Sequence, residues 1–141
     1  AADATDAVSP TATLAVTNNY SGVASGANTV TVTFDKLVQA FSASNSNSVL
    51  TISGCATNPT AAIAMSVNGS GNSVATATLS GGTCADLATV TVSLDLTKVT
   101  DQVGNVGDAS DNPTPVTYQI DLANPVATLA APDYGGGSYA D

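Results

Sequence analysis

The sequence is built from short runs in which apolar and polar side chains alternate. The clearest run, residues 88–97, places Val90, Val92 and Leu94 on one side and Thr, Ser and Asp on the other. Alternation with period two is the signature of a strand that buries one face. The same pattern recurs at residues 11–17, 29–35, 49–53, 61–67, 74–80 and 115–121. The chain therefore predicts seven half-buried strands.

The composition favours strands over helices. Glu and Arg are absent and Lys occurs twice, so charged helix formers are scarce, whereas Thr, Val, Ser, Gly and Asn are abundant. Residues 68–72 (Asn-Gly-Ser-Gly-Asn) have the composition of a hairpin turn between two of the expected strands. Short strands with turns between them predict an all-β fold, a seven-stranded antiparallel β-sandwich with a core of Val, Leu, Ile and Ala.

The charge of the chain excludes several functions. Eleven acidic residues against two basic ones give a net charge of −9. Such a balance argues against nucleic acids and anionic membrane surfaces, keeps a secreted protein soluble and suits divalent cations. No apolar run approaches the roughly 20 residues of a membrane helix, which predicts no membrane insertion. Since His, Glu and Arg are missing, the usual general base and oxyanion clamp are missing too, and we expect no enzymatic activity.

The chain contains two cysteines, Cys55 and Cys84. An even count in an acidic chain rich in Ser and Thr predicts one disulfide and an oxidising, extracellular compartment. Two free buried thiols are the alternative.

An internal repeat links the two ends of the chain. Residues 121–130 repeat residues 6–15 at an offset of 115, and the identities are Asp6/Asp121, Pro10/Pro125, Ala12/Ala127, Thr13/Thr128, Leu14/Leu129 and Ala15/Ala130. The alternative is chance similarity in a chain rich in Ala and Thr. A period near 115 matches one β-sandwich domain. The repeat therefore predicts one complete module at residues 1–121, followed by a linker and extension strand at residues 122–141.

The extension strand has an apolar face of its own. We expect Val126, Ala127, Leu129 and Ala131 to contact another copy of the chain, because a free strand with such a face would be an exposed edge.

Several stretches resemble the Ig-like repeats of large bacterial surface adhesins and biofilm-type proteins. They are Val30-Thr-Val-Thr-Phe-Asp35, Leu50-Thr-Ile-Ser-Gly54, Thr100-Asp-Gln-Val-Gly-Asn105 and Tyr118-Gln-Ile-Asp-Leu-Ala-Asn-Pro125. The resemblance covers most of residues 6–125. It implies an Ig-like fold, a location at the cell surface, a role in cell adhesion and, in some members, calcium at module junctions. The cysteine pair is a departure from many such repeats.

The Asp-rich loops offer candidate calcium ligands. Calcium takes six to eight oxygens, which short Asp and Asn side chains on loops can supply. We expect a site formed by Asp101 and Asn105 with Asp108 close behind and with Asp6 or Asp121 from a junction. A solvated acidic loop with Asx-turns is the alternative. Lys36 follows Asp35, which points outward in its strand, so the pattern predicts that Lys36 lies at the surface.

These observations predict a non-enzymatic extracellular structural module that builds a bacterial or archaeal cell-surface fibre. The chain is either the subunit of a pilus-like filament joined by strand addition or one repeat of a tandem adhesin. Its partners are then other copies of itself or adjacent modules. A glycan-binding Ig-like module is the alternative from another class, with surface glycans as partners and Tyr20 and Tyr118 as candidates for stacking on sugars.

Overall fold

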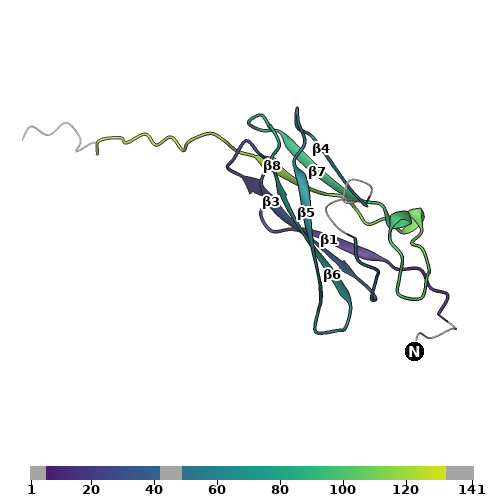
Figure 1. The fold of residues 1–141 in the computed structure, drawn as a ribbon. Coiled ribbons are helices and arrows are strands. Elements are labelled where there is room, and N and C mark those ends of the chain that lie inside the picture. Colours follow the sequence, from purple (N-terminus) through teal and green to yellow (C-terminus); the bar gives the residue numbers. More distant parts are fainter. Residues whose placement is uncertain (1–5, 42–48, 133–141) are drawn as a thin grey trace, which may run out of the picture.

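The computed structural model describes residues 6–41 and 49–132. In this part of the chain, eight strands form two four-stranded sheets, ordered β1-β3-β6-β5 and β2-β8-β7-β4 (Figure 1). The strands are β1 (Ala12–Val16), β2 (Tyr20–Ser21), β3 (Asn28–Phe34), β4 (Leu50–Ser53), β5 (Thr60–Val67), β6 (Ser73–Ser80), β7 (Thr89–Leu94) and β8 (Val116–Ile120). Two short 3-10 helices, η1 (Leu96–Lys98) and η2 (Ala109–Asp111), lie between β7 and β8.

The first sheet is antiparallel throughout. Strand β3 pairs with β1 on one side and with β6 on the other, and β6 pairs with β5. The turn at residues 68–72 joins β5 to β6 as the sequence predicts: the Asn68 side chain accepts hydrogen bonds from the backbone N–H groups of Ser70 (3.0 Å) and Asn72 (3.1 Å). Strand β1 is an edge strand and is held by β3 alone in this sheet.

The second sheet departs from the predicted seven antiparallel strands. Strands β4, β7 and β8 pair antiparallel, but β2 pairs parallel with β8. The sequence did not predict β2 because two residues are too short to show alternation. The predicted strand at residues 88–97 also ends early, at Leu94, because the Asp95 side chain accepts the N–H of Thr97 (3.0 Å) and starts η1.

The two sheets share one hydrophobic core. Its residues are the inward-facing members of the alternating runs, as predicted, and they include Val30, Val32, Phe34, Ala75, Ala77, Leu79, Val90, Val92, Leu94, Leu96, Tyr118 and Ile120. The only aromatic ring pair in the described part of the chain is Phe34 with Phe41, with centroids 6.2 Å apart and edge to face. Each fully buried Val or Leu contributes roughly 1.5–3 kcal/mol, so a core of such small side chains is thin and gains from covalent support.

A disulfide supplies that support at one end of the core. Cys55 and Cys84 are joined, with their Cα atoms 4.6 Å apart, and Cys84 is buried. Beside them the Tyr118 hydroxyl donates a hydrogen bond to the Gly26 carbonyl, and burial raises the pKa of Tyr118 to about 12. Gly26 has φ +64° and a Cβ there would lie 3.0 Å from the Cys84 sulfur, so both the backbone and the space require glycine. These contacts tie β8 to the loops at this end.

We expect titration of the denatured, non-reduced chain to find no free thiol. Reduction should lower the stability by about 3–4 kcal/mol, because the bond closes a loop with a sequence separation of 29 residues. Thermal unfolding with and without reductant measures the loss, and the Cys55→Ala/Cys84→Ala double variant serves as the control that reductant should leave unchanged. Two titratable thiols in the untreated chain would contradict the prediction.

Candidate functional site

Asp101 is a buried carboxylate at the end of the molecule where the N-terminal segment begins. Its side chain is 2 % exposed. The loop that follows η1 turns back on itself at this point: the Asp101 N–H donates to the Asn105 carbonyl (2.9 Å) and the Gly104 N–H donates to the Asp101 carbonyl (3.3 Å). Gly104 adopts φ +99°, which only glycine tolerates without strain. The tight loop places the Asn105 side chain next to the Asp101 carboxylate.

Both oxygens of the Asp101 carboxylate have partners. Oδ1 accepts the backbone N–H groups of Val103 (3.0 Å) and Asn105 (2.8 Å). Oδ2 accepts the Asn105 Nδ2 (2.9 Å) and the Lys36 Nζ (3.4 Å). A buried carboxylate is tolerated when its charge is paired and its oxygens accept hydrogen bonds, and here both conditions hold.

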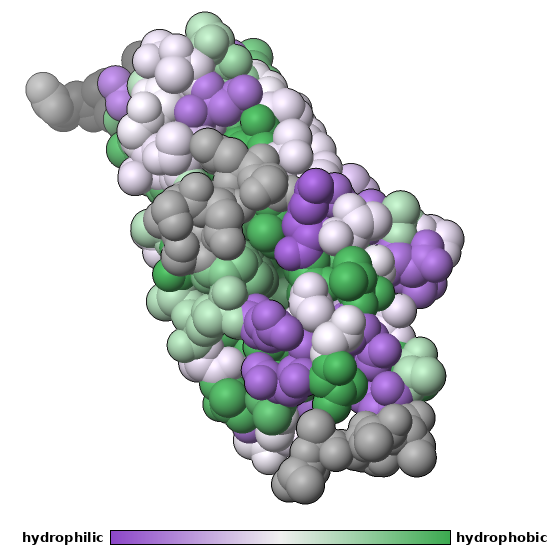
Figure 2. All heavy atoms as spheres, turned by 45° about the vertical axis from the view of Figure 1, so that its right-hand side comes forward, coloured by the Kyte–Doolittle hydropathy of each residue, from purple (hydrophilic) through white to green (hydrophobic). Residues whose placement is uncertain are grey.

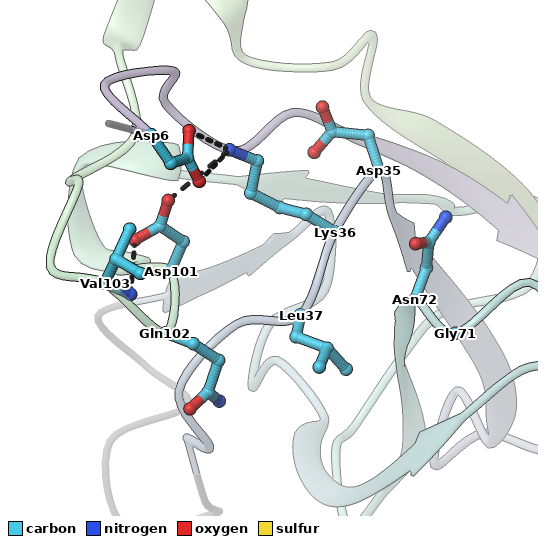
Figure 3. A pocket seen from close by; sticks show the side chains of 9 residues that line it. All are labelled: Asp6, Asp35, Lys36, Leu37, Gly71, Asn72, Asp101, Gln102 and Val103. Atoms are coloured by element: carbon cyan, nitrogen blue, oxygen red, sulfur yellow. Dashed lines mark hydrogen bonds and ion pairs between the residues drawn. The ribbon is translucent and has the colours of Figure 1, made fainter. Parts of the chain in front are cut away.

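Lys36, at the end of β3, binds the N-terminal segment to this loop. Its Nζ lies 3.3 and 3.2 Å from the two Asp6 oxygens and donates to the Val8 carbonyl at 2.6 Å. The Asn105 Nδ2 also donates to the Asp6 carbonyl (3.1 Å). Figure 3 shows the Asp6, Lys36 and Asp101 side chains pointing toward one another at one side of a pocket that Asp35, Leu37, Asn72 and Gln102 help to line. We call Asp6, Lys36, Asp101 and Asn105 the Lys36 cluster.

The contacts of the cluster shift two pKa values. Burial alone would raise the pKa of Asp101, but hydrogen bonds from Asn105, Val103 and Lys36 outweigh it and hold the pKa below its ordinary value. Burial would lower the pKa of Lys36, but Asp6 and Asp101 outweigh it and raise that pKa. Asp101 and Lys36 are therefore ionised at neutral pH. The contribution of this pair to stability is lost as the pH falls through the lowered Asp101 pKa or rises through the raised Lys36 pKa.

The structure brings together three of the five predicted calcium ligands and separates the other two. Asp6, Asp101 and Asn105 meet in the Lys36 cluster. Asp108 instead caps η2, where its Oδ1 accepts the Ser110 N–H and hydroxyl (2.9 Å each). Asp121 lies at the end of β8, where its N–H donates to the Ser21 carbonyl (2.9 Å). The sequence repeat suggested that Asp121 occupies an equivalent junction, but within this fold it has different neighbours.

Lys36 is the residue that the sequence interpretation missed. Its side chain is only 21 % exposed, although its place after the outward-facing Asp35 predicted a surface position. One signal was present in the sequence: a chain with two basic and eleven acidic residues has few cations with which to pair a carboxylate.

The cluster as it stands does not fit a calcium ion. Calcium needs six to eight free oxygens, whereas the Asp101 oxygens already accept three N–H donors and face an ammonium. In the described residues no group of three or more His, Cys, Asp or Glu side chains is placed to hold a metal ion. Calcium at Asp101, Asn105 and Asp6 stays a prediction from the sequence, and in this arrangement it would have to displace the Lys36 ammonium.

The tyrosines considered for sugar stacking differ in access. Tyr118 is buried, with its hydroxyl engaged at Gly26, whereas Tyr20 is exposed. The face in Figure 2 intersperses strongly hydrophilic with hydrophobic side chains. Among the described residues no helix is long and apolar enough to cross a membrane.

Comparisons with known proteins give low similarities. No protein-family model and no curated protein matches the sequence. Among solved structures, the N-terminal part of the bacterial S-layer protein SbsC is similar at 22 % identity over 85 % of this chain and 25 % of that chain, with a TM-score of 0.40. A second structure, S-layer protein rSbsC(31-844), is similar at 21 % identity over 84 % of this chain and 14 % of that one, with a TM-score of 0.40.

The chain thus spans a quarter or less of the length of these S-layer chains. The matches are to surface-layer structures rather than to adhesin repeats, and similarity at this level does not carry a function across. The resemblance to bacterial Ig-like adhesin repeats therefore stays a prediction.

We expect Asp101→Asn to lower the Tm by roughly 5–10 °C at neutral pH. Both oxygens of Asp101 accept hydrogen bonds, so whichever way an asparagine side chain is turned, its NH₂ group faces a donor. The substitution also removes the negative charge that faces Lys36. Thermal unfolding followed by circular dichroism measures the effect, with Asp111→Asn, an exposed carboxylate, as the control that should leave the Tm nearly unchanged. The difference between wild type and Asp101→Asn should shrink as the pH falls through the lowered pKa of Asp101, since both chains are then uncharged at this position. Equal melting of the two variants at neutral pH would show that the cluster does not stabilise the fold.

We expect millimolar calcium to leave the Tm unchanged relative to a sample in EDTA, because the Lys36 ammonium and three N–H donors already engage the carboxylate oxygens that calcium would need. A ligand that binds only the folded chain raises the Tm, so calorimetry in the two buffers decides the question. A rise that Asp101→Asn abolishes would instead support the calcium site predicted from the sequence.

Proposed function

We propose that residues 121–132, which we call the C-terminal segment, are the part of the chain that joins one copy to another. The N–H groups of Asp121 and Leu122 still bond to Ser21 and Asp86, and beyond them the segment runs away from the two sheets (Figure 1). All of these residues are exposed. Val126 is 92 % and Leu129 is 96 % exposed, the largest fractions among the exposed large hydrophobic residues of the described chain. The segment carries the repeat of residues 6–15. In that first copy of the repeat, residues 12–15 belong to strand β1, which pairs with β3. A strand-forming sequence with two fully exposed apolar side chains calls for a partner.

We propose that the chain is a non-enzymatic extracellular structural module that builds a bacterial or archaeal surface fibre. In this proposal the C-terminal segment joins each module to the next, and the partner is another copy of the chain or an adjacent module. The exposure of the segment, together with its repeat of the β1 sequence, is the observation that carries the proposal. The disulfide adds support for an oxidising, extracellular compartment.

The strand order supports the Ig-like part of the proposal. Ig-like sandwiches place strands A, B, E and D in one sheet and C, F and G in the other. If β1 is strand A, β3 is B, β4 is C and β5 to β8 are D to G, the order β1-β3-β6-β5 reads A-B-E-D, and β4-β7-β8 reads C-F-G. Strand β2 then adds a short edge beside G. Such modules expose both ends of the sandwich, which suits end-to-end arrangement.

A filament of separate subunits and a tandem array in one polypeptide both use the C-terminal segment in this way. The mass of the native mature protein separates them, since a filament subunit has the mass of one module and a tandem array has the mass of many.

We expect deletion of residues 122–141 to leave a folded monomer and to abolish self-association. The described part of the deleted stretch is exposed, so its removal should leave the Tm within a few degrees of wild type. Light scattering after size-exclusion chromatography, over a range of concentrations, measures association. Val67→Asp, which changes an exposed valine on β5, is the control that should still associate. If the truncated chain unfolds, or associates like wild type, the proposal is wrong.

A further inference from the structure

The C-terminal segment repeats most of the residues through which the N-terminal segment contacts the domain. Residues 6–16, the leading segment, contact the rest of the domain through a few positions. Asp6 pairs with Lys36, Pro10 is buried, and Ala12 and Leu14 pack against the core. Each of these positions holds the identical residue at an offset of 115: Asp121, Pro125, Ala127 and Leu129. Positions 7, 8, 9 and 11, which differ in the repeat, are not among the buried residues. Val16, which also packs against the core, is replaced by the smaller Ala131.

The leading segment also makes contacts that use only its backbone. The Val8 carbonyl accepts the Lys36 Nζ. The Thr11 N–H donates to the Asp35 side chain (2.9 Å), and the Thr11 carbonyl accepts the Asp35 N–H (3.1 Å). Any residue can make these bonds except where proline removes an N–H. The equivalent positions in the C-terminal segment hold Ala123 and Val126, so the bonds are available to it.

Both segments also begin with the same local turn. The Asp6 Oδ1 accepts the N–H of Val8 (3.0 Å), and the Asp121 Oδ1 accepts the N–H of Ala123 (3.2 Å). This Asx-turn sets the direction of the chain after the aspartate. In the leading segment it presents the Asp6 carboxylate to Lys36. The exposed segment therefore begins with the same turn as the leading segment.

We infer that the C-terminal segment of one copy binds a second copy by taking the place of its leading segment. This inference rests on the proposed function and adds the binding position. Residues 121–131 would lie where residues 6–16 lie, with Asp121 beside Lys36 and Leu129 in place of Leu14. The register follows from the β1 pairing, in which Leu14 lies opposite Val32, so Leu129 lies opposite Val32 of the second copy.

The leading segment of the second copy competes for the same position. It is tethered to its own domain, and a tethered competitor acts at an effective concentration in the millimolar range. If the C-terminal segment replaces the leading segment, a substitution that weakens the binding of the leading segment must strengthen the association between copies. If the C-terminal segment only adds to a free sheet edge, such a substitution has no such effect. Leu14 in the leading segment and Leu129 in the C-terminal segment are equivalent positions of the repeat. The same substitution at each of them therefore weakens either the competing segment or the binding segment.

The test compares Leu14→Asp with Leu129→Asp in the full chain. We expect Leu14→Asp to tighten association by roughly tenfold or more, since it penalises only the competing segment. Leu129→Asp should abolish association and leave the Tm of the monomer unchanged. Asp121→Asn should weaken association several-fold, whereas Asp111→Asn should not. Sedimentation equilibrium measures each constant.

The outcomes separate this inference from the proposed function. If Leu129→Asp abolishes association but Leu14→Asp leaves it unchanged or weakens it, the segment joins copies at another edge and replacement is overturned. If neither substitution matters, the proposed function fails as well. If the Leu14→Asp chain does not fold alone, a synthetic peptide of residues 121–132 should restore its circular dichroism spectrum. The same peptide with Leu129→Asp should not, and failure of the first peptide to restore folding overturns the inference.

Discussion

The pairing of Lys36 with two carboxylates holds together segments that are far apart in the chain. Its ammonium lies within 3.4 Å of oxygens from Asp6, at the start of the described chain, and from Asp101, in the loop after η1. A buried carboxylate without a partner destabilises a protein strongly, and Lys36 pairs the one charge of the loop that faces the leading segment. The chain has only one other basic residue, Lys98.

The other end of the domain is held by different means. There the disulfide, the Tyr118 hydroxyl and the close approach at Gly26 connect the loops. Charge fixes one end and a covalent bond fixes the other. Conditions that weaken one end, such as acid for the Lys36 cluster or a reductant for the disulfide, should therefore leave the other end intact.

The sequence predicts the strands well where burial is one-sided. Val30, Val32 and Phe34 alternate with threonines, and this period alone places them in the core. The sequence predicts an element poorly where hydrogen bonds, and not burial, determine where the element begins and ends. Strand β2 has only two residues, and η1 begins because Asp95 binds a backbone N–H that a strand would have used otherwise. Three of the four residues of the Lys36 cluster were predicted, and Lys36 was not. The loop motif located Asp101 and Asn105, but the position of Lys36 depends on tertiary contacts that alternation does not encode.

The positions of the two terminal segments matter for a module that bears tension. In Figure 1 the chain enters near one end of the sheets and leaves from the other. A force between the ends would pull β1 along its own axis, so its five pairings with β3 would be loaded in shear and would have to break together rather than one after another. If the domain did open, the disulfide would keep residues 55–84 closed. The disulfide spans a sequence separation of 29 residues, so about 100 Å of chain could not extend. The opened module would therefore lengthen less than it would without the disulfide.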